Sequence, residues 1–310
     1  MSKTIIVTGA NGYLGTVICN LLVANEYNVI GIDNYMRPMS DFMFYLNRFP
    51  NFQFIKTDIR DENISKVLKD SDFVVHAAAL SGEPLCKANP SEAWSVNFDG
   101  TMCLADQKPK HAKLLFYSSG SVYGKLDTIC TEKSPTNPLS IYAQSKLEAE
   151  NELLKYHKDN IIIYRFSTAY GLSGNMRTNL LLNDLAHKAV RGEDLTIFQA
   201  DFRRSFVHVT DIANSILAAI ENADIMSGEI YNVGNAEGNW SKRKAATYIQ
   251  QLTNCRLHFA DEGYIDPDGR DYEIDFYKIN KFWKASVSME TGISELIKGL
   301  KTLHEVSKFR

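Results

Sequence analysis

Near its amino terminus the chain reads Thr8-Gly9-Ala10-Asn11-Gly12-Tyr13-Leu14-Gly15. An apolar, β-rich run over residues 3–8 leads into this segment, and an amphipathic stretch over residues 12–25 follows it. The pattern predicts a strand, a tight turn at Gly9, and a helix that Gly15 allows to pack closely on the strand. Gly12 lets the backbone approach a pyrophosphate, and the helix amino terminus offers it N–H groups and a positive dipole end. The spacing is G-x-x-G-x-x-G, and its place between strand and helix indicates a nucleotide site.

Outward from this segment, apolar runs alternate with helical patterns. The runs show little strict alternation, as expected of strands buried on both faces of a sheet. This alternation predicts an α/β fold with a doubly wound parallel Rossmann sheet. The predicted strands after the first cover residues 28–33, 52–57, 72–76, 114–118 and 160–166, and helices are predicted, for example, over 91–107 and 141–156.

The pattern loosens after residue 171, but no Pro-, Gly- or Ser-rich linker marks a tethered module. We therefore expect a second lobe that packs on the first. The predicted division is an NAD-binding Rossmann domain over residues 1–171 and a smaller C-terminal substrate-binding lobe over 172–310. Parts of 205–235 are predicted to return to the Rossmann sheet.

Composition excludes several classes of protein. With 45% apolar and 23% charged residues the 310-residue chain is globular, and a net charge of −3 gives no broad attraction for nucleic acid or anionic lipid. No apolar run reaches the roughly 18 residues of a membrane helix, and glycines interrupt the first residues too early for a signal peptide. The five cysteines are scattered without a C-x-x-C pair, so we expect no metal site and a cytoplasmic location.

An acidic residue closes the second predicted strand. Asp33 stands at about the distance from the glycines where a carboxylate accepts the ribose hydroxyls of an adenosine. A carboxylate there repels a 2′-phosphate, so NAD is favoured over NADP, although Arg37 nearby weakens that preference. A helix or turn cap is the alternative role. Asp58 ends the third predicted strand, within reach of the adenine edge.

Tyr142 and Lys146 form a Y-x-x-x-K pair on one face of a predicted helix. The ammonium can lower the pKa of the phenol and so create a base that works near neutral pH. Tyr277 and Lys281 have the same spacing, so the motif alone is not specific. Only Tyr142 follows a serine-rich strand end, at residues 116–121, at a reach suited to a serine–tyrosine–lysine set.

With these features the chain resembles the extended short-chain dehydrogenases/reductases, specifically the NAD-dependent nucleotide-sugar epimerase/dehydratase family. The resemblance runs from Thr8 to about Lys278, nearly the whole chain. Besides the motifs above, it rests on His76-Ala77-Ala78-Ala79 and on residues 97–101, 118–124, 203–211 and 231–234.

The resemblance implies roles for particular residues. Tyr142 would take a proton from a sugar hydroxyl, Lys146 would hold the nicotinamide ribose, and Ser119 would steady the proton on the sugar oxygen. Implied NAD contacts are Gly9, Gly12, Tyr13, Leu14, Gly15, Asp33, Asn34, Asp58, Ile59, Ala77, Ala78, Ala79, Asn97, Ser118, Tyr142, Lys146 and Phe166. Implied substrate contacts are Ser81, Ser119, Ser121, Thr168, Asn179, Arg204 and Arg270; for Arg204 the alternative is an exposed arginine on a β run.

The two residues after Ser119 limit which reaction can follow oxidation of the sugar. Family dehydratases and uronate decarboxylases carry an acid there, whereas this chain has Gly120 and Ser121. The resemblance therefore favours NAD-dependent oxidation at C4 of a nucleotide-activated sugar, completed as an epimerase or as a 4-dehydrogenase in cell-surface polysaccharide biosynthesis. Residues 83–90, 176–181 and 266–272 resemble the bacterial capsule and lipopolysaccharide branch, which includes enzymes that oxidise C4 of GDP-linked heptoses.

Two other functions remain open, as do the nucleotide and the sugar. An NADPH-dependent ketoreductase of a deoxysugar pathway is disfavoured by Asp33. A non-catalytic NAD-binding sensor is disfavoured because Ser119, Tyr142 and Lys146 are all present. The resemblance also implies a homodimer, in which the helix near 91–107 and the helix carrying Tyr142 form a four-helix interface.

Overall fold

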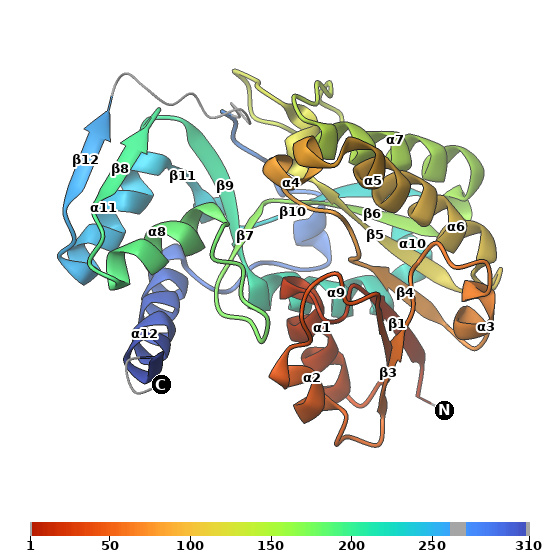
Figure 1. Ribbon diagram of the computed structural model, residues 1–310. Coiled ribbons are helices and arrows are strands. Elements are labelled where there is room, and N and C mark those ends of the chain that lie inside the picture. The colour runs from red at the N-terminus through yellow and green to blue at the C-terminus, as the bar shows by residue number, and fades with distance from the viewer. Residues whose placement is uncertain (1, 261–270, 308–310) are drawn as a thin grey trace.

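The computed structural model describes residues 2–260 and 271–307 (Figure 1). Its centre is a sheet of seven strands that all run parallel, which confirms the predicted doubly wound α/β fold. In spatial order the strands are β10 (Glu229–Val233), β6 (Ile161–Phe166), β5 (Lys113–Ser119), β4 (Phe73–His76), β1 (Thr4–Thr8), β2 (Asn28–Asp33) and β3 (Phe52–Lys56).

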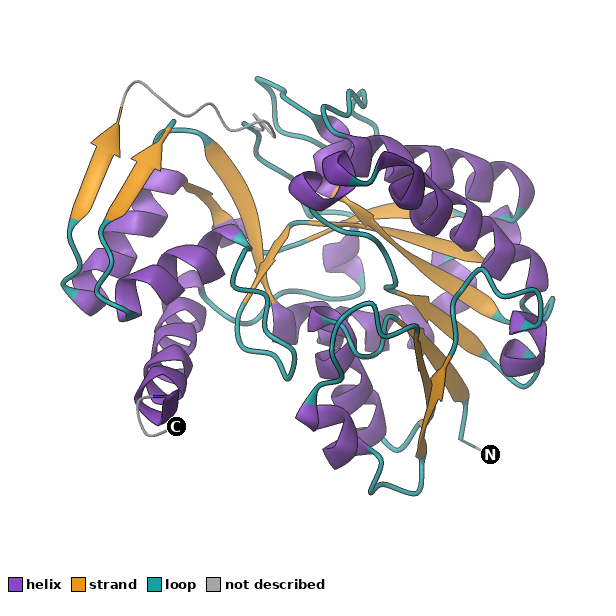
Figure 2. Ribbon diagram, in the orientation of Figure 1, coloured by secondary structure: helices purple, strands orange, loops and turns teal. Residues whose placement is uncertain are grey.

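Helices cover both faces of this sheet (Figure 2). On one face α1 (Tyr13–Ala24) and α9 (Val209–Glu221) pack together, with α2 (Asp41–Leu46) against α1. On the other lie α3 (Ile64–Leu68), α6 (Gly100–Gln107) and α7 (Ile141–Tyr156). Short helices α4 (Glu83–Ala88), α5 (Pro90–Trp94) and α10 (Ala223–Met226) and 3₁₀ turns at Lys158–Asn160, Ala236–Gly238 and Ile279–Lys281 connect the elements.

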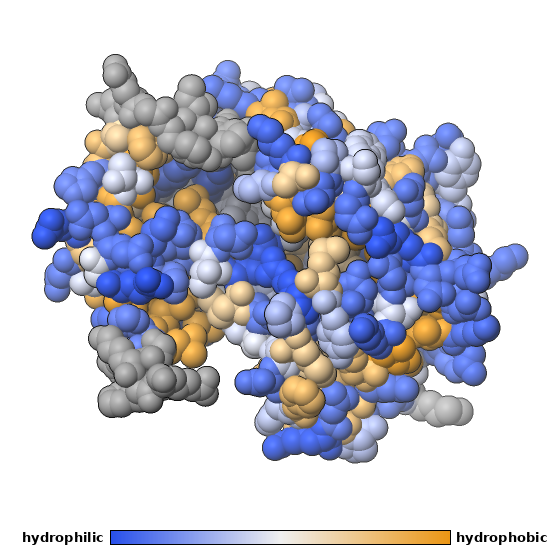
Figure 3. Space-filling view, viewed as in Figure 1, coloured by the Kyte–Doolittle hydropathy of each residue, from blue (hydrophilic) through white to orange (hydrophobic). Residues whose placement is uncertain are grey.

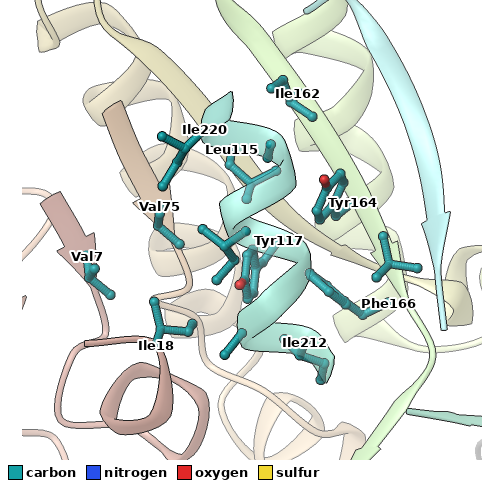
Figure 4. Packing of buried hydrophobic residues seen from close by; sticks show 14 of the residues in the cluster. Val7, Ile18, Val75, Leu115, Tyr117, Ile162, Tyr164, Phe166, Ile212 and Ile220 are labelled. Atoms are coloured by element: carbon teal, nitrogen blue, oxygen red, sulfur yellow. The ribbon is translucent and has the colours of Figure 1, made fainter. Parts of the chain in front are cut away.

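Alternate strand residues enter two separate hydrophobic cores. Val75 and Leu115 face α1 and α9, whereas Val74 and Leu114 pack beneath α3, α6 and α7. Figure 4 shows the first of these cores, with α9 lying across the strands. Burial of a Val or Leu side chain contributes roughly 1.5–3 kcal/mol. Burial on both faces is the reason that the strands read as continuous apolar runs in the sequence.

The second lobe has its own core between α8 (Leu181–Val190), α11 (Lys242–Thr253) and α12 (Met289–Ser307). Two parallel strands, β8 (Leu195–Phe198) and β12 (Leu257–Ala260), flank these helices. A small sheet of β7 (Thr168–Tyr170), β9 (Arg203–His208) and β11 (Asn239–Ser241) lies between the lobes. After β9 the chain returns to the first lobe as α9, α10 and β10. Residues after 171 therefore contribute to both lobes, and the division of the chain at residue 171 stays a prediction.

The helix predicted over residues 91–107 is not uniform. A π-helical segment, Ser95–Asp99, joins α5 to α6. Such segments often occur at functional sites, and here the segment contains Asn97, whose side chain is considered below. Among the described residues, none of the helices combines the length and the apolar character needed to cross a bilayer.

Candidate active site

The glycine-rich loop lies at the carboxyl end of β1 and forms one wall of a cleft between the lobes. The space-filling view shows the surface hollowed between the two lobes (Figure 3). Gly9 has φ of +69°, and a Cβ on it would lie 2.9 Å from the Ala78 backbone. A Cβ on Gly15 would overlap the Gly9 carbonyl. Helix α1 begins after Gly12 without a side-chain cap, so its first N–H groups are available to a diphosphate.

The Asp33 carboxylate is oriented by two backbone groups. Its Oδ2 accepts from the Asn11 N–H (3.1 Å) and its Oδ1 from the Tyr35 N–H (2.9 Å). Burial raises the pKa of Asp33, while these two hydrogen bonds oppose the rise. Each oxygen retains acceptor capacity towards the cleft, which fits the two hydroxyls of an unphosphorylated ribose.

Asp33→Ala is expected to weaken NAD binding roughly 10- to 100-fold, because hydrogen bonds to a charged group are lost. NADP binding should weaken much less, since the same change removes repulsion of its 2′-phosphate. Titration calorimetry with both cofactors measures the difference. An equal loss for both would leave Asp33 with only the capping role.

Asp58, which is predicted to lie within reach of the adenine, is already paired. Arg60 donates to both its oxygens (2.9 and 2.8 Å), and Asn34 Nδ2 donates to Oδ2 (2.9 Å). The hydrogen bond from Arg60 is the main reason that the pKa of Asp58 lies well below its usual range. Asp58 therefore stays ionised in this wall of the cleft.

The predicted catalytic side chains come from β5 and α7. Ser119 ends β5 and precedes a 3₁₀ turn, Gly120–Tyr123, in which the Ser121 hydroxyl donates to Ser119 Oγ (2.8 Å). Ser140 caps α7 by accepting from the Ala143 N–H (3.2 Å). Ser119, Tyr142 and Lys146 line the same cleft as the glycine-rich loop. The structure thus brings the two predicted motifs together.

Lys146 is the least exposed of the three, with 1% of its surface accessible. Its Nζ has no hydrogen-bond partner in the described part of the chain and lies 4.6 Å from the centre of the Phe116 ring. Burial lowers the pKa of Lys146 to about 7, although the charges of Cys86 and Glu150 act in the opposite direction. An unpartnered buried amine is costly, and ribose hydroxyls of NAD would satisfy it. The cleft therefore fits NAD at both its phosphate and its ribose positions.

Lys146→Met should stabilise the NAD-free enzyme and flatten the pH dependence of its stability. Between pH 7 and 10.5 the unfolded lysine binds a proton that the folded one has lost, so the free energy of unfolding rises with pH in this window. The variant lacks that contribution. Urea unfolding from pH 6 to 10 compares the two proteins. If the free energy of unfolding of both proteins had the same dependence on pH, the predicted cost of burying the Lys146 ammonium would be contradicted.

Behind the catalytic side chains lies a buried charged network. Glu150, one helical turn after Lys146, accepts from the Ser118 hydroxyl and from Arg165 Nε (3.1 Å) and Nη2. Arg165 Nη1 donates to the Tyr123 hydroxyl (3.1 Å), which donates to Asn232 Oδ1 (2.6 Å). The network joins α7 to β5, β6 and β10 and so fixes the helix that carries Tyr142.

Most of the predicted contact residues line the cleft. On the cofactor side these are Gly9, Gly12, Tyr13, Leu14, Gly15, Asp33, Asn34, Asp58, Ile59, Ala77, Ala78, Ala79, Ser118, Tyr142, Lys146 and Phe166. On the substrate side they are Ser81, Ser119, Ser121 and Thr168. Their contacts with ligands stay predictions.

Three predicted residues do not line the cleft, and a fourth lies outside the described residues. Asn97 is fully buried and clamps the Leu80 backbone, donating to its carbonyl (3.0 Å) and accepting from its N–H (2.8 Å). Asn179 is exposed and accepts from Arg177 Nε (3.2 Å). Arg204 is only 2% exposed and donates to the Arg203 carbonyl (3.1 Å), so its alternative interpretation as an exposed arginine is wrong. Arg270 lies outside the described residues.

Three charged residues that line the cleft, Arg37, Glu83 and Arg177, were not predicted as site residues. Glu83 Oε2 accepts from the Tyr142 N–H at 3.5 Å, and the Arg177 side chain donates to Ser81. Glu83 and Arg177 belong to the segments 83–90 and 176–181, which stood apart from the general pattern of the family. A charged side chain within each of these segments was the signal in the sequence that could have identified them.

The fold, the glycine-rich loop and the serine–tyrosine–lysine set in one cleft define an extended short-chain dehydrogenase/reductase. The sequence profile of the NAD dependent epimerase/dehydratase family matches residues 5–234, and the chain belongs to that family. Membership confirms the prediction of an enzyme and of NAD as its cofactor.

Several relatives extend over nearly the whole chain. An uncharacterised UDP-glucose epimerase of Bacillus subtilis is 28% identical, covering 97% of this chain and 99% of its own length. A putative UDP-glucose 4-epimerase of Methanocaldococcus jannaschii is also 28% identical, with coverages of 96% and 98%. The crystal structure of UDP-glucuronic acid 4-epimerase from Bacillus cereus, in complex with UDP-glucuronic acid and NAD, superposes with a TM-score of 0.86 at 28% identity, covering 97% and 99%.

Proposed function

We propose that this enzyme is a C4 epimerase of a nucleotide-activated sugar, with a UDP-sugar as the first substrate to test. The coarser function, an NAD-using nucleotide-sugar epimerase/dehydratase, is supported by the relatives described above. The observation that carries the proposal is the shared cleft, in which Ser119, Tyr142 and Lys146 face the glycine-rich loop and Asp33.

In the proposed reaction the Tyr142 phenol, as phenolate, takes the proton of the C4 hydroxyl and later returns it. The Lys146 ammonium stabilises that phenolate and binds the nicotinamide ribose. Ser119 Oγ, oriented by the Ser121 hydroxyl, steadies the sugar oxygen. NAD, which the glycine-rich loop, Asp33 and Lys146 would hold, would supply reversible hydride transfer at C4. For net epimerisation the cleft must have room for the keto sugar to rotate, so that its opposite face is reduced.

The segment after Ser119 argues against dehydration and decarboxylation. A Cβ on Gly120 would lie 2.8 Å from Ile274 Cδ1, so a longer side chain there would disturb the packing. Ser121 presents a hydroxyl that is hydrogen-bonded to Ser119. Neither position offers a carboxylate for removing a proton or water next to the ketone.

The test is product analysis with UDP-, GDP-, dTDP- and CDP-sugars, by mass spectrometry and absorbance. An isomeric product without net NADH supports the epimerase. Stoichiometric NADH, with a product lighter by two hydrogens, would instead establish a 4-dehydrogenase. No turnover of any of these sugars, by an enzyme that binds NAD, would overturn the proposal.

A role in cell-surface polysaccharide biosynthesis and a homodimer belong to the same proposal. Helix α7 contacts both α5 and α6, and the three helices form one layer on the sheet. This layer is the surface expected to pair with a second copy. Light scattering at micromolar concentration tests the dimer, and a monomer would count against it. A cytoplasmic location stays a prediction.

A further inference from the structure

A loop of the second lobe is fastened across the glycine-rich loop. This loop, residues 171–177, is called the strap. Ser173 Oγ donates to the Tyr13 carbonyl (2.6 Å), and Asn175 Nδ2 donates to the Asn11 carbonyl (2.6 Å). In return the Tyr13 hydroxyl donates to the Gly171 carbonyl (2.8 Å). The strap and the glycine-rich loop therefore form one hydrogen-bonded unit.

Asn183 at the start of α8 fixes the end of the strap. Its Nδ2 donates to the Arg177 carbonyl (2.9 Å) and to the Tyr13 hydroxyl (3.0 Å), while its Oδ1 accepts from the Gly171 N–H (3.1 Å). Asn183 is fully buried. The backbone of Arg177 is thus held in a defined position relative to Tyr13, which stands at the first turn of α1.

The Arg177 side chain turns into the cleft and is held by two residues. Its Nη1 donates to Ser81 Oγ and its Nη2 to the Ser81 carbonyl, while its Nε donates to Asn179 Oδ1 (3.2 Å). These contacts use three of the five N–H groups of the guanidinium. The two others, one on each Nη, remain for a ligand in the cleft that Arg177 lines.

The surrounding charges favour an anion. No carboxylate among the described residues forms a salt bridge with Arg177, and the nearby Arg37, which also lines the cleft, is another cation. Burial and then the charge of Arg37 lower the pKa of Arg177, although the group stays protonated. A partly buried cation without a carboxylate is stabilised when an anion binds, and a planar guanidinium suits phosphate oxygens.

We propose that Arg177 binds a diphosphate group in the cleft, reaching it from the substrate lobe. The cleft receives two such groups, one in NAD and one in a nucleotide sugar. The attachment of the strap to Asn11 and Tyr13, beside the amino terminus of α1, points to the cofactor's diphosphate. Ser81 and Asn179, which hold the guanidinium, are implied substrate contacts and point to the substrate's diphosphate, so the titrations below decide between the two. For the substrate's diphosphate the inference rests on the proposed function.

The test uses Arg177→Met and Arg177→Lys, with Arg191→Met as the control. Arg191 lies at the end of α8, where it pairs with Glu193 at the surface. Calorimetry on NAD-depleted enzyme gives the affinity for NAD. A second titration gives the affinity for whichever of UDP, GDP, dTDP and CDP binds the unaltered enzyme most tightly.

Arg177→Met should weaken binding of the ligand whose diphosphate Arg177 contacts by about 10- to 100-fold, because charge-assisted hydrogen bonds are lost. Arg177→Lys should keep part of that affinity, and Arg191→Met should change neither.

The two titrations separate the sources of the diphosphate. A loss confined to NAD assigns Arg177 to the cofactor, and a loss confined to the nucleoside diphosphate assigns it to the substrate. Affinities within about twofold of the unaltered enzyme for both ligands would overturn the proposal. Equal losses for both, together with a lowered melting temperature that Arg191→Met does not show, would also overturn it by showing a structural role. NAD affinity is independent of the sugar turned over, so a wrong proposed function would not alter that result.

Discussion

Replacing Tyr142 by phenylalanine is expected to reduce turnover by about two to four orders of magnitude, the usual contribution of a positioned acid–base group. The ring and its packing on α7 are kept, and only the phenolic oxygen that exchanges a proton with the sugar is lost. NAD affinity should change much less than turnover, because Tyr142 is only one of the implied NAD contacts, and Lys146 and the glycine-rich loop are untouched. Steady-state kinetics with the substrate from the product screen measures the loss, and NAD titration checks that the cleft is intact.

The chain supplies its own control for this experiment. Tyr277 and Lys281 repeat the Y-x-x-x-K spacing, but Tyr277 is 69% exposed and is not among the residues that line the cleft. Tyr277→Phe should therefore leave turnover unchanged. Near-normal activity of Tyr142→Phe, or an equal loss in both variants, would refute the assignment of Tyr142 as the base.

Arg165→Met should lower the free energy of unfolding by roughly 3–5 kcal/mol, because it leaves the Glu150 carboxylate buried without its cation. Glu150 is 1% exposed and Arg165 4% exposed, so water cannot replace the lost partner. The same change releases the Tyr123 hydroxyl from Arg165 and loosens the contact of α7 with β6. Chemical denaturation monitored by circular dichroism gives the magnitude.

Two further variants show whether the uncompensated charge is the cause. The exposed pair of Arg191 and Glu193 should contribute less than about 1 kcal/mol, so Arg191→Met should be nearly neutral. The double variant Glu150→Gln with Arg165→Met removes both charges and should recover a large part of the lost stability. A double variant as unstable as Arg165→Met would show that lost packing, and not a stranded charge, is responsible.

The parallel sheet could be predicted because its strands are apolar on both faces. Residues such as Val74 and Val75 enter different cores, and this leaves a continuous apolar run that is visible in the sequence. The cleft could be predicted for a related reason. The carboxyl ends of parallel strands meet at one edge of the sheet, so Gly9 after β1, Asp33 at the end of β2 and Ser119 at the end of β5 had to converge.

The loops that close the cleft could not be derived in the same way, since they have no periodicity. Arg177 reaches the cleft through a loop conformation that depends on contacts between distant residues, such as that of Asn183 with Tyr13. Glu83 reaches it from the first turn of the short helix α4. Asn97 was predicted to touch the cofactor, but the π-helical segment turns its amide onto the Leu80 backbone. Its burial depends on tertiary packing that no local pattern encodes.

The return of the chain to the first lobe as β10 also affects the order in which the two lobes fold during synthesis. Strand β10 pairs with β6, and each residue of β10 lies 67 positions after its partner, with Glu229 opposite Ile162. The edge of β6 therefore stays open while the ribosome synthesises α8, β8 and β9 of the other lobe. At a synthesis rate of about 5–20 residues per second this interval lasts several seconds. The first lobe is consequently the first to begin folding, but its sheet cannot be completed until part of the second lobe has been synthesised. A nascent chain stalled before residue 229 would present the unpaired edge of β6 to other chains.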